Sequence, residues 1–354
     1  MKVGILTFHR AINYGAVLQT YALQETLRSL GHEVWVIDYR QPRVERTDRR
    51  PFYPDDKINL LKGLHLRSWW NFNDNRQQTL LRRQRFDDFL HTYLHLTEPC
   101  TQDTIPAMDC YVIGSDQVWN SAICDGLDPV FWGNFNRPKV SKVISYAAST
   151  SVKDLQMHDR NVIQNYLDNF KDVSVREQGV YDYLKNNFVI RNVGVVLDPT
   201  LLAEPIVWDG FRDDSSNQRE YVLYFGARRC IKYSTVLHDK AESLAKQYGC
   251  DMKTIDFNSD SPVDFVNKFR NAKAVVTSSF HGVAFSLIFK KSLYAVQYGD
   301  DQDARYTNVL KSIGAEEMLI DLHQDVCPQT FDYGNTNKLI SDLRVHSFNF
   351  IKEI

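Results

Sequence analysis

The sequence predicts an α/β protein with two domains that face a cleft. Apolar runs of strand length alternate with helical patterns, and the alternation restarts after a polar stretch at residues 209–220. The length of 354 residues is too great for one typical domain and suits two. Continuous apolar strands separated by helices are typical of parallel sheets that are covered on both faces.

The first domain is expected to span residues 1–207. Its first strand, "KVGILTF" at residues 2–8, is too short for the apolar part of a signal peptide, and the helix after it, over about residues 14–30, is stopped by Gly31. The other expected strands lie at residues 33–39, 110–115, 142–147, 172–177 and 193–198, with helical patterns near residues 77–94, 154–170 and 178–187.

The second domain is expected to span residues 218–335, after the polar linker. Its expected strands lie at residues 221–226, 251–256, 273–278 and 292–296, and its helices lie near residues 235–249, 261–271, 282–289 and 304–313. Residues 336–354 are predicted to form a C-terminal helix that packs back on the first domain. The carboxyl ends of the strands, where α/β proteins bind their ligands, are expected to face the cleft.

The composition excludes several classes of partner. The formal net charge of −2 gives no global attraction to nucleic acid. The six cysteines follow no paired spacing, which favours reduced thiols and a cytoplasmic protein. No apolar run approaches the length of a membrane span.

Residues 40–85 depart from the pattern and are interpreted as a basic insertion after the second strand. They hold twelve Arg or Lys residues against five acidic residues, and they include Trp69 and Trp70. A solvated loop and helix face is one interpretation of this segment. The other is a flap that meets an anionic or lipid-linked substrate and gives peripheral contact with the inner membrane face.

The stretch "TSSFHGVAF" at residues 277–285 lies where a buried strand gives way to a helix. The N–H groups of a helix start attract anions, so Ser278, Ser279 and Gly282 are candidate anion-binding positions. His281 could transfer a proton near neutral pH. The alternative is a capped helix whose histidine is satisfied within the fold.

A second polar cluster, "GSDQVWN" at residues 114–120, follows another expected strand. Asp116 and Gln117 could hydrogen-bond to the hydroxyls of a sugar, while Trp119 could stack on the C–H face of its ring. Asn120 completes the cluster. The alternative is a structural turn around a buried tryptophan.

Two further segments follow strands in the first domain. In "HRAINYGAVLQTYAL" at residues 9–23, Asn13 begins the turn into the helix and Gln19 lies one turn further on; the segment lacks the G-x-G-x-x-G of a dinucleotide site. Arg176 closes the strand "DVSVRE", and arginine suits the clamping of a carboxylate or a phosphate. The alternative is an ion pair between Arg176 and Glu177 or another acid.

Metal and hydrolase motifs are not apparent. His91 and His95 have the i, i+4 spacing of a metal pair, but the glutamate of a zincin is missing from "HTYLH". The sequence contains neither a G-x-S-x-G elbow nor a P-loop. We therefore expect no metal site.

Taken in order, five segments resemble the polysaccharide pyruvyl transferase family: "NYGAVLQTYAL", "YVIGSDQVWN", "SVRE", "LDPTLL" and "TSSFHGVAFSLIF". The resemblance implies a GT-B-like fold of two Rossmann-like domains. It also implies a transferase that uses phosphoenolpyruvate as donor, attaches pyruvate as a cyclic ketal to two hydroxyls of a sugar and releases phosphate. The acceptor would be a surface polysaccharide, such as exopolysaccharide or capsule, or its lipid-linked precursor. Phosphoenolpyruvate is a co-substrate, and no cofactor is implied.

The resemblance also suggests roles for individual residues. His281 falls on a key active-site histidine of the family, and Arg176 falls on the arginine that closes its "S-x-R-E"-like strand. Some members carry an arginine two positions before the histidine, where this chain has Ser279, and Arg305 could supply that charge. Asp116 would orient or deprotonate the acceptor. The expected acceptor-binding residues are Asn13, Tyr14, Gln19, Gln117, Trp119 and Asn120.

Two other functions remain open from the sequence. One is a sugar-nucleotide glycosyltransferase of the same two-domain shape. The other is a non-catalytic saccharide-binding protein whose donor site has decayed, for which Ser279 is the hint. Binding of a nucleoside diphosphate, or donor binding without phosphate release, would distinguish these from a pyruvyl transferase.

Overall fold

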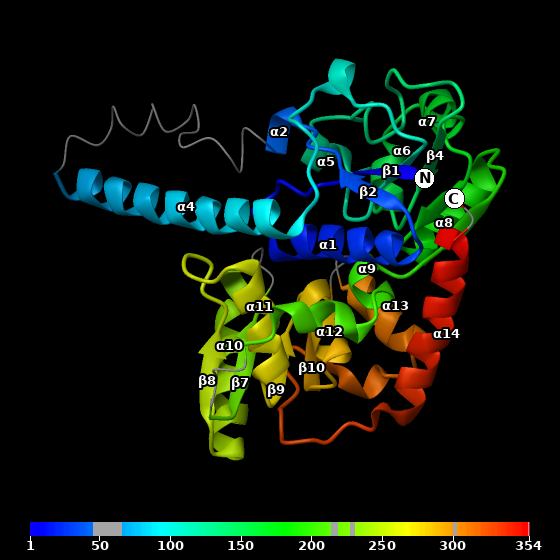
Figure 1. Ribbon diagram of the computed structural model, residues 1–354. Coiled ribbons are helices and arrows are strands. Elements are labelled where there is room, and N and C mark those ends of the chain that lie inside the picture. The colour runs from blue at the N-terminus through cyan, green and yellow to red at the C-terminus, as the bar shows by residue number, and fades with distance from the viewer. Residues whose placement is uncertain (45–65, 214–218, 227–230, 300–302, 353) are drawn as a thin grey trace. The chain divides into compact units, whose positions relative to one another are not determined.

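The computed structural model describes residues 1–44, 66–213, 219–226, 231–299, 303–352 and 354, with the backbone alone described at 66–76 and 231–234. The chain forms two compact units (Figure 1). Unit 1 consists of Met1–Pro199, Phe257–Pro262 and Phe350–Ile354. Unit 2 consists of Thr200–Asp256 and Val263–Asn349.

Unit 1 is built on a parallel sheet with the strand order β2-β1-β3-β4. The strands are β1 (Lys2–Leu6), β2 (Glu33–Val36), β3 (Cys110–Ile113) and β4 (Lys142–Ser145). A second parallel pair, β5 (Val173–Val175) and β6 (Val193–Val195), is linked to the β4 region by the bridges Ile144–Asp172 and Ala148–Val175. β1 and β3 are apolar and almost entirely buried, as expected for a parallel sheet covered on both faces.

The helices of unit 1 follow the strands. α1 (Tyr14–Ser29) is capped by Asn13, whose Oδ1 accepts a hydrogen bond from Gly15 N at 2.9 Å. α4 (Leu66–Tyr93) extends from unit 1 as one long helix (Figure 1). The remaining helices are α2 (Pro42–Val44), the 3₁₀ helix η2 (Gln102–Thr104), α5 (Ser121–Cys124), α6 (Val152–Gln156), α7 (Arg160–Leu167) and α8 (Gln178–Asn187).

Unit 2 contains a parallel sheet of five strands in the order β11-β10-β9-β7-β8. The strands are β7 (Tyr221–Phe225), β8 (Asp251–Thr254), β9 (Ala274–Thr277), β10 (Ser292–Gln297) and β11 (Leu319–Asp321). The helices are α9 (Pro199–Leu202), η3 (Pro205–Phe211), α10 (Ile231–Tyr248), α11 (Pro262–Asn271), α12 (Phe280–Ile288), α13 (Ala304–Ser312), η4 (Glu316–Met318) and α14 (Tyr333–Lys352), of which α9, α11 and α14 begin or end in unit 1.

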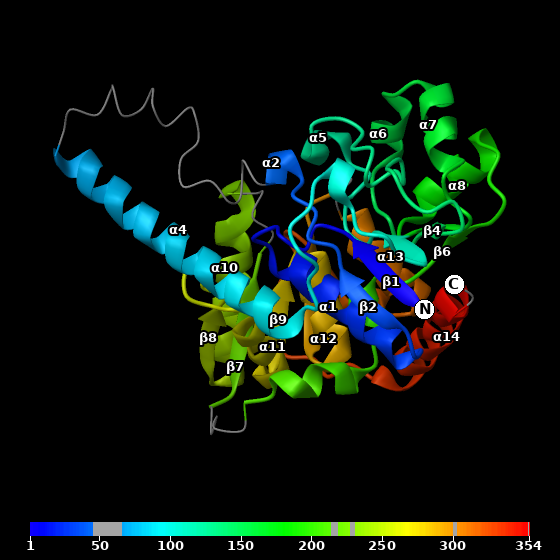
Figure 2. The ribbon, with the colours of Figure 1, turned by 45° about the horizontal axis from the view of Figure 1, so that its top comes forward.

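Helices cover both faces of this second sheet. On one face, Val222, Ala274 and Val276 pack in a single apolar cluster with Leu237 and Leu244 of α10. Figures 1 and 2 show α10 beside β7 and β8. On the other face, Phe225 meets Phe265 of α11 at a ring distance of 5.1 Å, and Phe265 meets Phe285 of α12 at 5.6 Å. Successive side chains of β7 point to opposite faces of the sheet, so α10 packs on one face and α11 and α12 pack on the other.

The predicted fold class is confirmed, because each unit is an α/β structure with a parallel sheet. The expected helix over 154–170 is two helices, α6 and α7, since Asp159 caps a new helix start at Asn161 N and Val162 N. The expected helix near 77–94 begins earlier, at Leu66 within the basic insertion. Residues 45–65 of that insertion, and the side chains of Trp69 and Trp70, lie outside the described part of the chain.

The boundary between the units differs from the sequence prediction. The chain passes from unit 1 to unit 2 after Pro199 and not after residue 207. The expected polar linker at 209–220 is ordered at its start, because η3 buries Trp208 and Phe211. Trp208 lies against Phe285 of α12 with ring centroids 4.9 Å apart. The short 3₁₀ segment has too few residues to show a periodic apolar pattern, which explains why the sequence predicts a linker there.

Among the helices of the described residues, none combines the length and the hydropathy that a membrane crossing would require.

The packing of Trp208 predicts a large effect on stability. Trp208→Ala should lower the free energy of unfolding by about 3–5 kcal/mol, because a fully buried indole is removed. Ile206→Ala, in the same short helix, should change it by no more than about 0.5 kcal/mol, since Ile206 is 70% exposed. Urea denaturation measures both. Equal effects would show that residues 205–211 are an unpacked linker after all.

Candidate functional site

In unit 2 the candidate site lies where β9 ends and α12 begins. Ser279 occupies the N-cap position with extended backbone angles, but its side chain makes no capping hydrogen bond. His281 is the second residue of the helix and is half-buried, with its ring edge-on to Phe280 at 5.1 Å. The first N–H groups of any helix have no partner within the helix. The helix start therefore combines an anion-attracting end, a hydroxyl group and an imidazole within three residues.

Thr277, the last residue of β9, holds this helix start in place. Its Oγ1 donates to Phe225 O at 2.6 Å and accepts from Ser279 N at 3.1 Å. A side chain at position 282 would overlap Thr277 Oγ1 and come within 2.9 Å of Thr277 Cβ, so only glycine fits there. Gly282 thus allows α12 to pack closely on β9. This packing explains the glycine without the anion-binding role that the sequence analysis suggests for it.

The neighbouring strand end of unit 2 is organised by Asp303. The carboxylate of Asp303 accepts hydrogen bonds from Tyr298 N and Gly299 N, both at 2.7 Å, and from the Tyr306 hydroxyl at 2.6 Å. The hydroxyl of Tyr298 lies 3.0 Å from Ser278 Oγ. Arg305 is half-buried in the first turn of α13, two residues after Asp303. The carboxyl ends of β9 and β10 are therefore joined through Ser278 and Tyr298.

In unit 1, Arg176 is buried within a network of acids. Its Nη1 donates to Asp198 Oδ2 at 2.9 Å and its Nε to Glu177 Oε1 at 3.2 Å, while Nη2 donates to Ser149 Oγ at 3.0 Å. Burial opposes the charge, but Glu177 and Asp198 outweigh it, so the pKa of Arg176 is raised above its usual value. The ion pair, which the sequence left as the alternative, is the arrangement found. A donor-binding role for Arg176 stays a prediction.

The same network reaches the end of β3. Ser115 Oγ donates to Asp198 Oδ2 at 3.2 Å, and Thr7 Oγ1, after β1, donates to Ser115 O at 2.9 Å. Asp116 follows with a φ of 67°, in the left-handed region that asparagine and aspartate tolerate best among non-glycine residues. Its Oδ1 accepts from Gln117 N at 2.8 Å, and its carboxylate is half-buried. Residues with such unusual backbone angles are concentrated at functional sites, so Asp116 stays a candidate site residue.

Three of the expected acceptor contacts are corrected by their burial. Trp119 is 1% exposed, stacks on Trp132 at 4.5 Å and donates from Nε1 to Phe131 O, so neither face is open to a sugar. Gln19 is fully buried and its amide nitrogen bonds to Thr7 Oγ1 at 2.9 Å. Tyr14 is 2% exposed and its hydroxyl donates to Asp260 O at 3.0 Å. All three build the core of unit 1.

The remaining expected acceptor contacts serve local structure. Asn13 caps α1 and is exposed. Asn120 caps α5 through Oδ1, which accepts from Ala122 N at 3.0 Å. Its amide nitrogen donates to Gln117 Oε1 at 2.8 Å, which links the two amides directly. Their role with an acceptor stays a prediction.

A buried pair that sequence reasoning missed lies at the ends of β1 and β2. His9 Nε2 is 3.0 Å from Asp38 Oδ1, and Arg10 and Arg40 contact the same carboxylate at 3.1 and 3.0 Å. Burial would raise the pKa of Asp38, but the hydrogen bond and charge of His9, with both arginines, lower it to about 2. Two sequence segments could have indicated this pair: "FHR", which follows the first strand, and "VIDYR", which lies at the end of the second. Their pairing depends on the parallel register of β1 and β2.

Two histidine groups bear on metal binding. His95 stacks on Trp35 at 4.0 Å and its Nδ1 lies 3.1 Å from Val34 O, so it is part of the fold. On α10, His238, Asp239 and Glu242 bring potential ligand atoms within 4.8 Å of one another at the surface. Glu242 there pairs with Lys246 at 2.9 Å.

A family model described as polysaccharide pyruvyl transferase matches residues 13–300. The chain belongs to the polysaccharide pyruvyl transferase family. The match covers well over half of the chain and contains all five segments that carried the resemblance. No curated protein sequence gives a significant match to this pyruvyl transferase family member.

Solved structures match most of the chain at low sequence identity and with TM-scores below 0.5. UDP-GlcNAc 2-epimerase from Methanocaldococcus jannaschii is 11% identical, with 96% of this chain and 92% of that chain covered and a TM-score of 0.43. The spinosyn rhamnosyltransferase SpnG is 10% identical, with 99% and 91% covered and a TM-score of 0.40. At this level of similarity, neither bears on the ligand or the reaction of this chain.

The close approach of α12 and β9 yields a first test of the site. Gly282→Ala should lower the free energy of unfolding by about 1–3 kcal/mol, because the added methyl group overlaps Thr277. Gly210→Ala is the matched control, since nothing lies within 4 Å of the methyl group it adds. Both are measured by urea denaturation. No loss in the Gly282 variant would contradict the packing described here.

The Asp38 cluster predicts a pH dependence. The pKa of Asp38 is lowered on folding from its ordinary value of 3.8 to about 2, so its carboxylate stabilises the fold above about pH 4. The difference in free energy of unfolding between wild type and Asp38→Asn should be constant above about pH 5 and shrink between about pH 4 and about pH 2. The exposed Asp88→Asn should stay within about 0.5 kcal/mol of wild type throughout. A difference that is independent of pH would exclude the ionised carboxylate as its source.

Proposed function

We propose that this family member transfers a pyruvyl group from phosphoenolpyruvate to a saccharide and forms a cyclic ketal. The observation that carries the proposal is the place of His281, in the first turn of α12 at the carboxyl end of β9, within a chain of the polysaccharide pyruvyl transferase family. The acceptor is a surface polysaccharide or its lipid-linked precursor. Phosphate is the second product.

The reaction needs proton transfers that His281 is suited to make. Protonation of the methylene carbon C3 makes C2 electrophilic, a sugar hydroxyl attacks C2, phosphate leaves, and a second hydroxyl of the sugar closes the ketal. The two attacking hydroxyls lose one proton each; one proton is gained by C3 of the donor, and the other leaves with the phosphate. A histidine both donates and accepts protons near neutral pH, and such catalysis contributes roughly 10²–10⁴-fold.

The donor carries a phosphate and a carboxylate, which require cations and N–H donors. The start of α12 attracts anions; the N–H of Ser279 itself donates to Thr277 Oγ1, while the Ser279 hydroxyl makes no cap bond that would compete. Ser279 stands where some family members have an arginine, and Arg305 in the first turn of α13 supplies a positive charge in our proposal. Asp116 is proposed to orient or deprotonate the acceptor hydroxyl.

The basic insertion at 40–85 is proposed to meet the lipid-phosphate end of the acceptor at the inner membrane face. Its excess of seven positive charges supports this, since each Lys or Arg near an anionic surface contributes about 1 kcal/mol. Within the described part of the insertion, Arg40 pairs with Asp38 and Arg43 lies 3.5 Å from Asp125. Arg82 donates to Ile12 O and Arg83 is buried, so the proposed contact rests on the other basic residues of the segment.

A phosphate-release assay with phosphoenolpyruvate and a panel of saccharide acceptors tests this function. His281→Ala should lower kcat by about 10²–10⁴-fold while leaving the melting temperature within about 2 °C of wild type, because a half-buried polar side chain is removed. His323→Ala, an exposed histidine of the same unit, is the matched control and should keep wild-type activity.

Other outcomes would assign another function. Stabilisation by a nucleoside diphosphate and none by phosphoenolpyruvate would indicate a sugar-nucleotide glycosyltransferase. Binding of phosphoenolpyruvate without release of its phosphate in the presence of any acceptor would indicate a saccharide-binding protein. If the His281 variant keeps more than about a tenth of wild-type kcat, His281 is not the acid–base group.

A further inference from the structure

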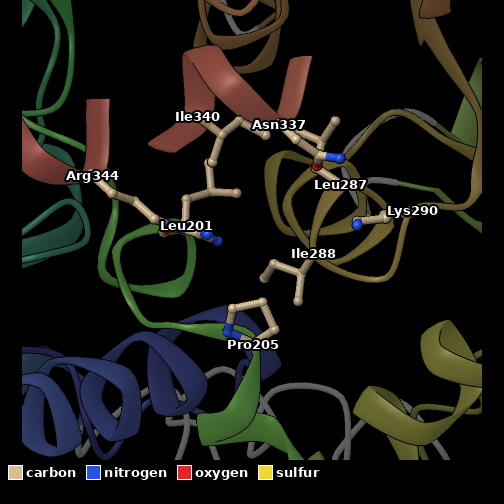
Figure 3. A pocket seen from close by; sticks show the side chains of 8 residues that line it. All are labelled: Leu201, Pro205, Leu287, Ile288, Lys290, Asn337, Ile340 and Arg344. Carbon is tan, nitrogen blue, oxygen red and sulfur yellow. The ribbon is translucent and has the colours of Figure 1, made fainter. Parts of the chain in front are cut away.

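A pocket of about 240 Å³ lies within unit 2, away from the proposed active site. Its walls come from three parts of the unit: the segment α9–η3, the end of α12, and α14 (Figure 3). The lining residues are Leu201, Pro205, Leu287, Ile288, Lys290, Asn337, Ile340 and Arg344. Five of these eight side chains are apolar, and two carry a positive charge.

The pocket belongs to the opposite end of α12 from His281. His281 opens the helix at the carboxyl end of β9, whereas Leu287 and Ile288 close it and Lys290 follows. Nine residues separate His281 from Lys290, which is about 13 Å along a helix. β10 begins at Ser292, so the pocket lies toward the amino edge of the sheet. None of its residues has a role in the proposed function, so the inference stands independently of it.

Arg344 is fixed in the pocket with part of its guanidinium available. Its Nε donates to Leu201 O at 2.6 Å, which anchors the side chain. In the described part of the chain, no carboxylate lies within ion-pair distance of Arg344. Burial lowers the pKa of Arg344, and the carboxylate of Glu204 opposes this only in part. A half-buried guanidinium of this kind gains from an anion that accepts hydrogen bonds from its Nη1 and Nη2 groups.

Lys290 provides the second positive charge. Its φ of 51° lies in the left-handed region, where the residue after a helix end is usually glycine or asparagine. The helix end itself favours a cation, so the charge alone has a structural reason. The direction of the Lys290 side chain supports a role in the pocket. Figure 3 shows the Lys290 amine and the Arg344 guanidinium turned toward the same space from opposite sides.

We propose that this pocket binds a small amphipathic anion, namely an organic acid with one charged head group and a short hydrocarbon body. The two cations suit the head group, and Leu201, Ile288 and Ile340 suit the body. The volume lies below the roughly 300–1,000 Å³ of sites for drug-sized ligands, which limits the hydrocarbon to a short chain. Apolar walls with a few convergent polar groups are the usual composition of a small-molecule site.

Titration calorimetry of the full chain with octanoate tests the proposal. We expect saturable binding of one octanoate. 1-Octanol has the body without the charge, and acetate has the charge without the body, so each should bind at least about 10-fold more weakly. Octanoate that binds no more tightly than either compound would overturn the proposal, as would no binding at all.

Two variants locate the binding. Lys290→Asn removes the charge but keeps a residue that accepts the left-handed backbone, and it should weaken octanoate binding about 10–150-fold. Lys338→Asn, an exposed lysine of α14 outside the lining, should bind as wild type.

Ile340→Trp should block the pocket and abolish binding, whereas Val345→Trp, on the exposed side of α14, should not. Melting curves check that each variant is folded. Unchanged octanoate affinity in the folded Lys290 variant would place the ligand elsewhere and overturn the proposal.

Discussion

The ion pair between Arg176 and Asp198 holds the carboxyl edge of unit 1 together. Arg176 follows β5 and Asp198 follows β6, while Ser149 and Ser115, after β4 and β3, bond to the same two side chains. Both charges are buried, and a buried charge is costly unless it is paired. Each strand end is therefore tied to its neighbours, and Asp116, which follows Ser115, takes its position from this network.

The network also bears on where a donor anion can bind. Arg176 faces two carboxylates, Glu177 and Asp198, so the group as a whole has no surplus of positive charge. An anion with several negative charges would meet repulsion from these acids as well as attraction to the guanidinium. At the start of α12, Thr277 bonds to neutral groups, namely the carbonyl of Phe225 and the amide of Ser279. In our proposal the donor binds in unit 2, at the start of α12.

Sequence patterns predict features that depend on neighbouring residues, such as strands and helix starts. They do not reveal contacts between residues that are distant in the sequence. The strands and the start of α12 could be located because apolar runs and helix starts are local signals. The sequence leaves two roles open for Trp119, because a tryptophan after a strand looks the same whether it binds sugar or packs on Trp132. The pairing of His9 with Asp38, 29 residues away, required the register of two strands. η3 was missed because a 3₁₀ turn is too short for periodicity.

The hydrogen bond from Tyr14 to Asp260 constrains the order in which the chain can fold during synthesis. The two residues are 246 positions apart, yet both belong to unit 1, and Phe257 lies against Tyr14 at 5.8 Å. The ribosome releases most of unit 1 first, but this part of its packing must wait until Thr200–Asp256 of unit 2 has emerged. Contacts between such distant positions slow folding, and domains that fold during synthesis usually complete in chain order. The packing of the first unit to leave the ribosome is therefore completed only after part of the second unit has been synthesised.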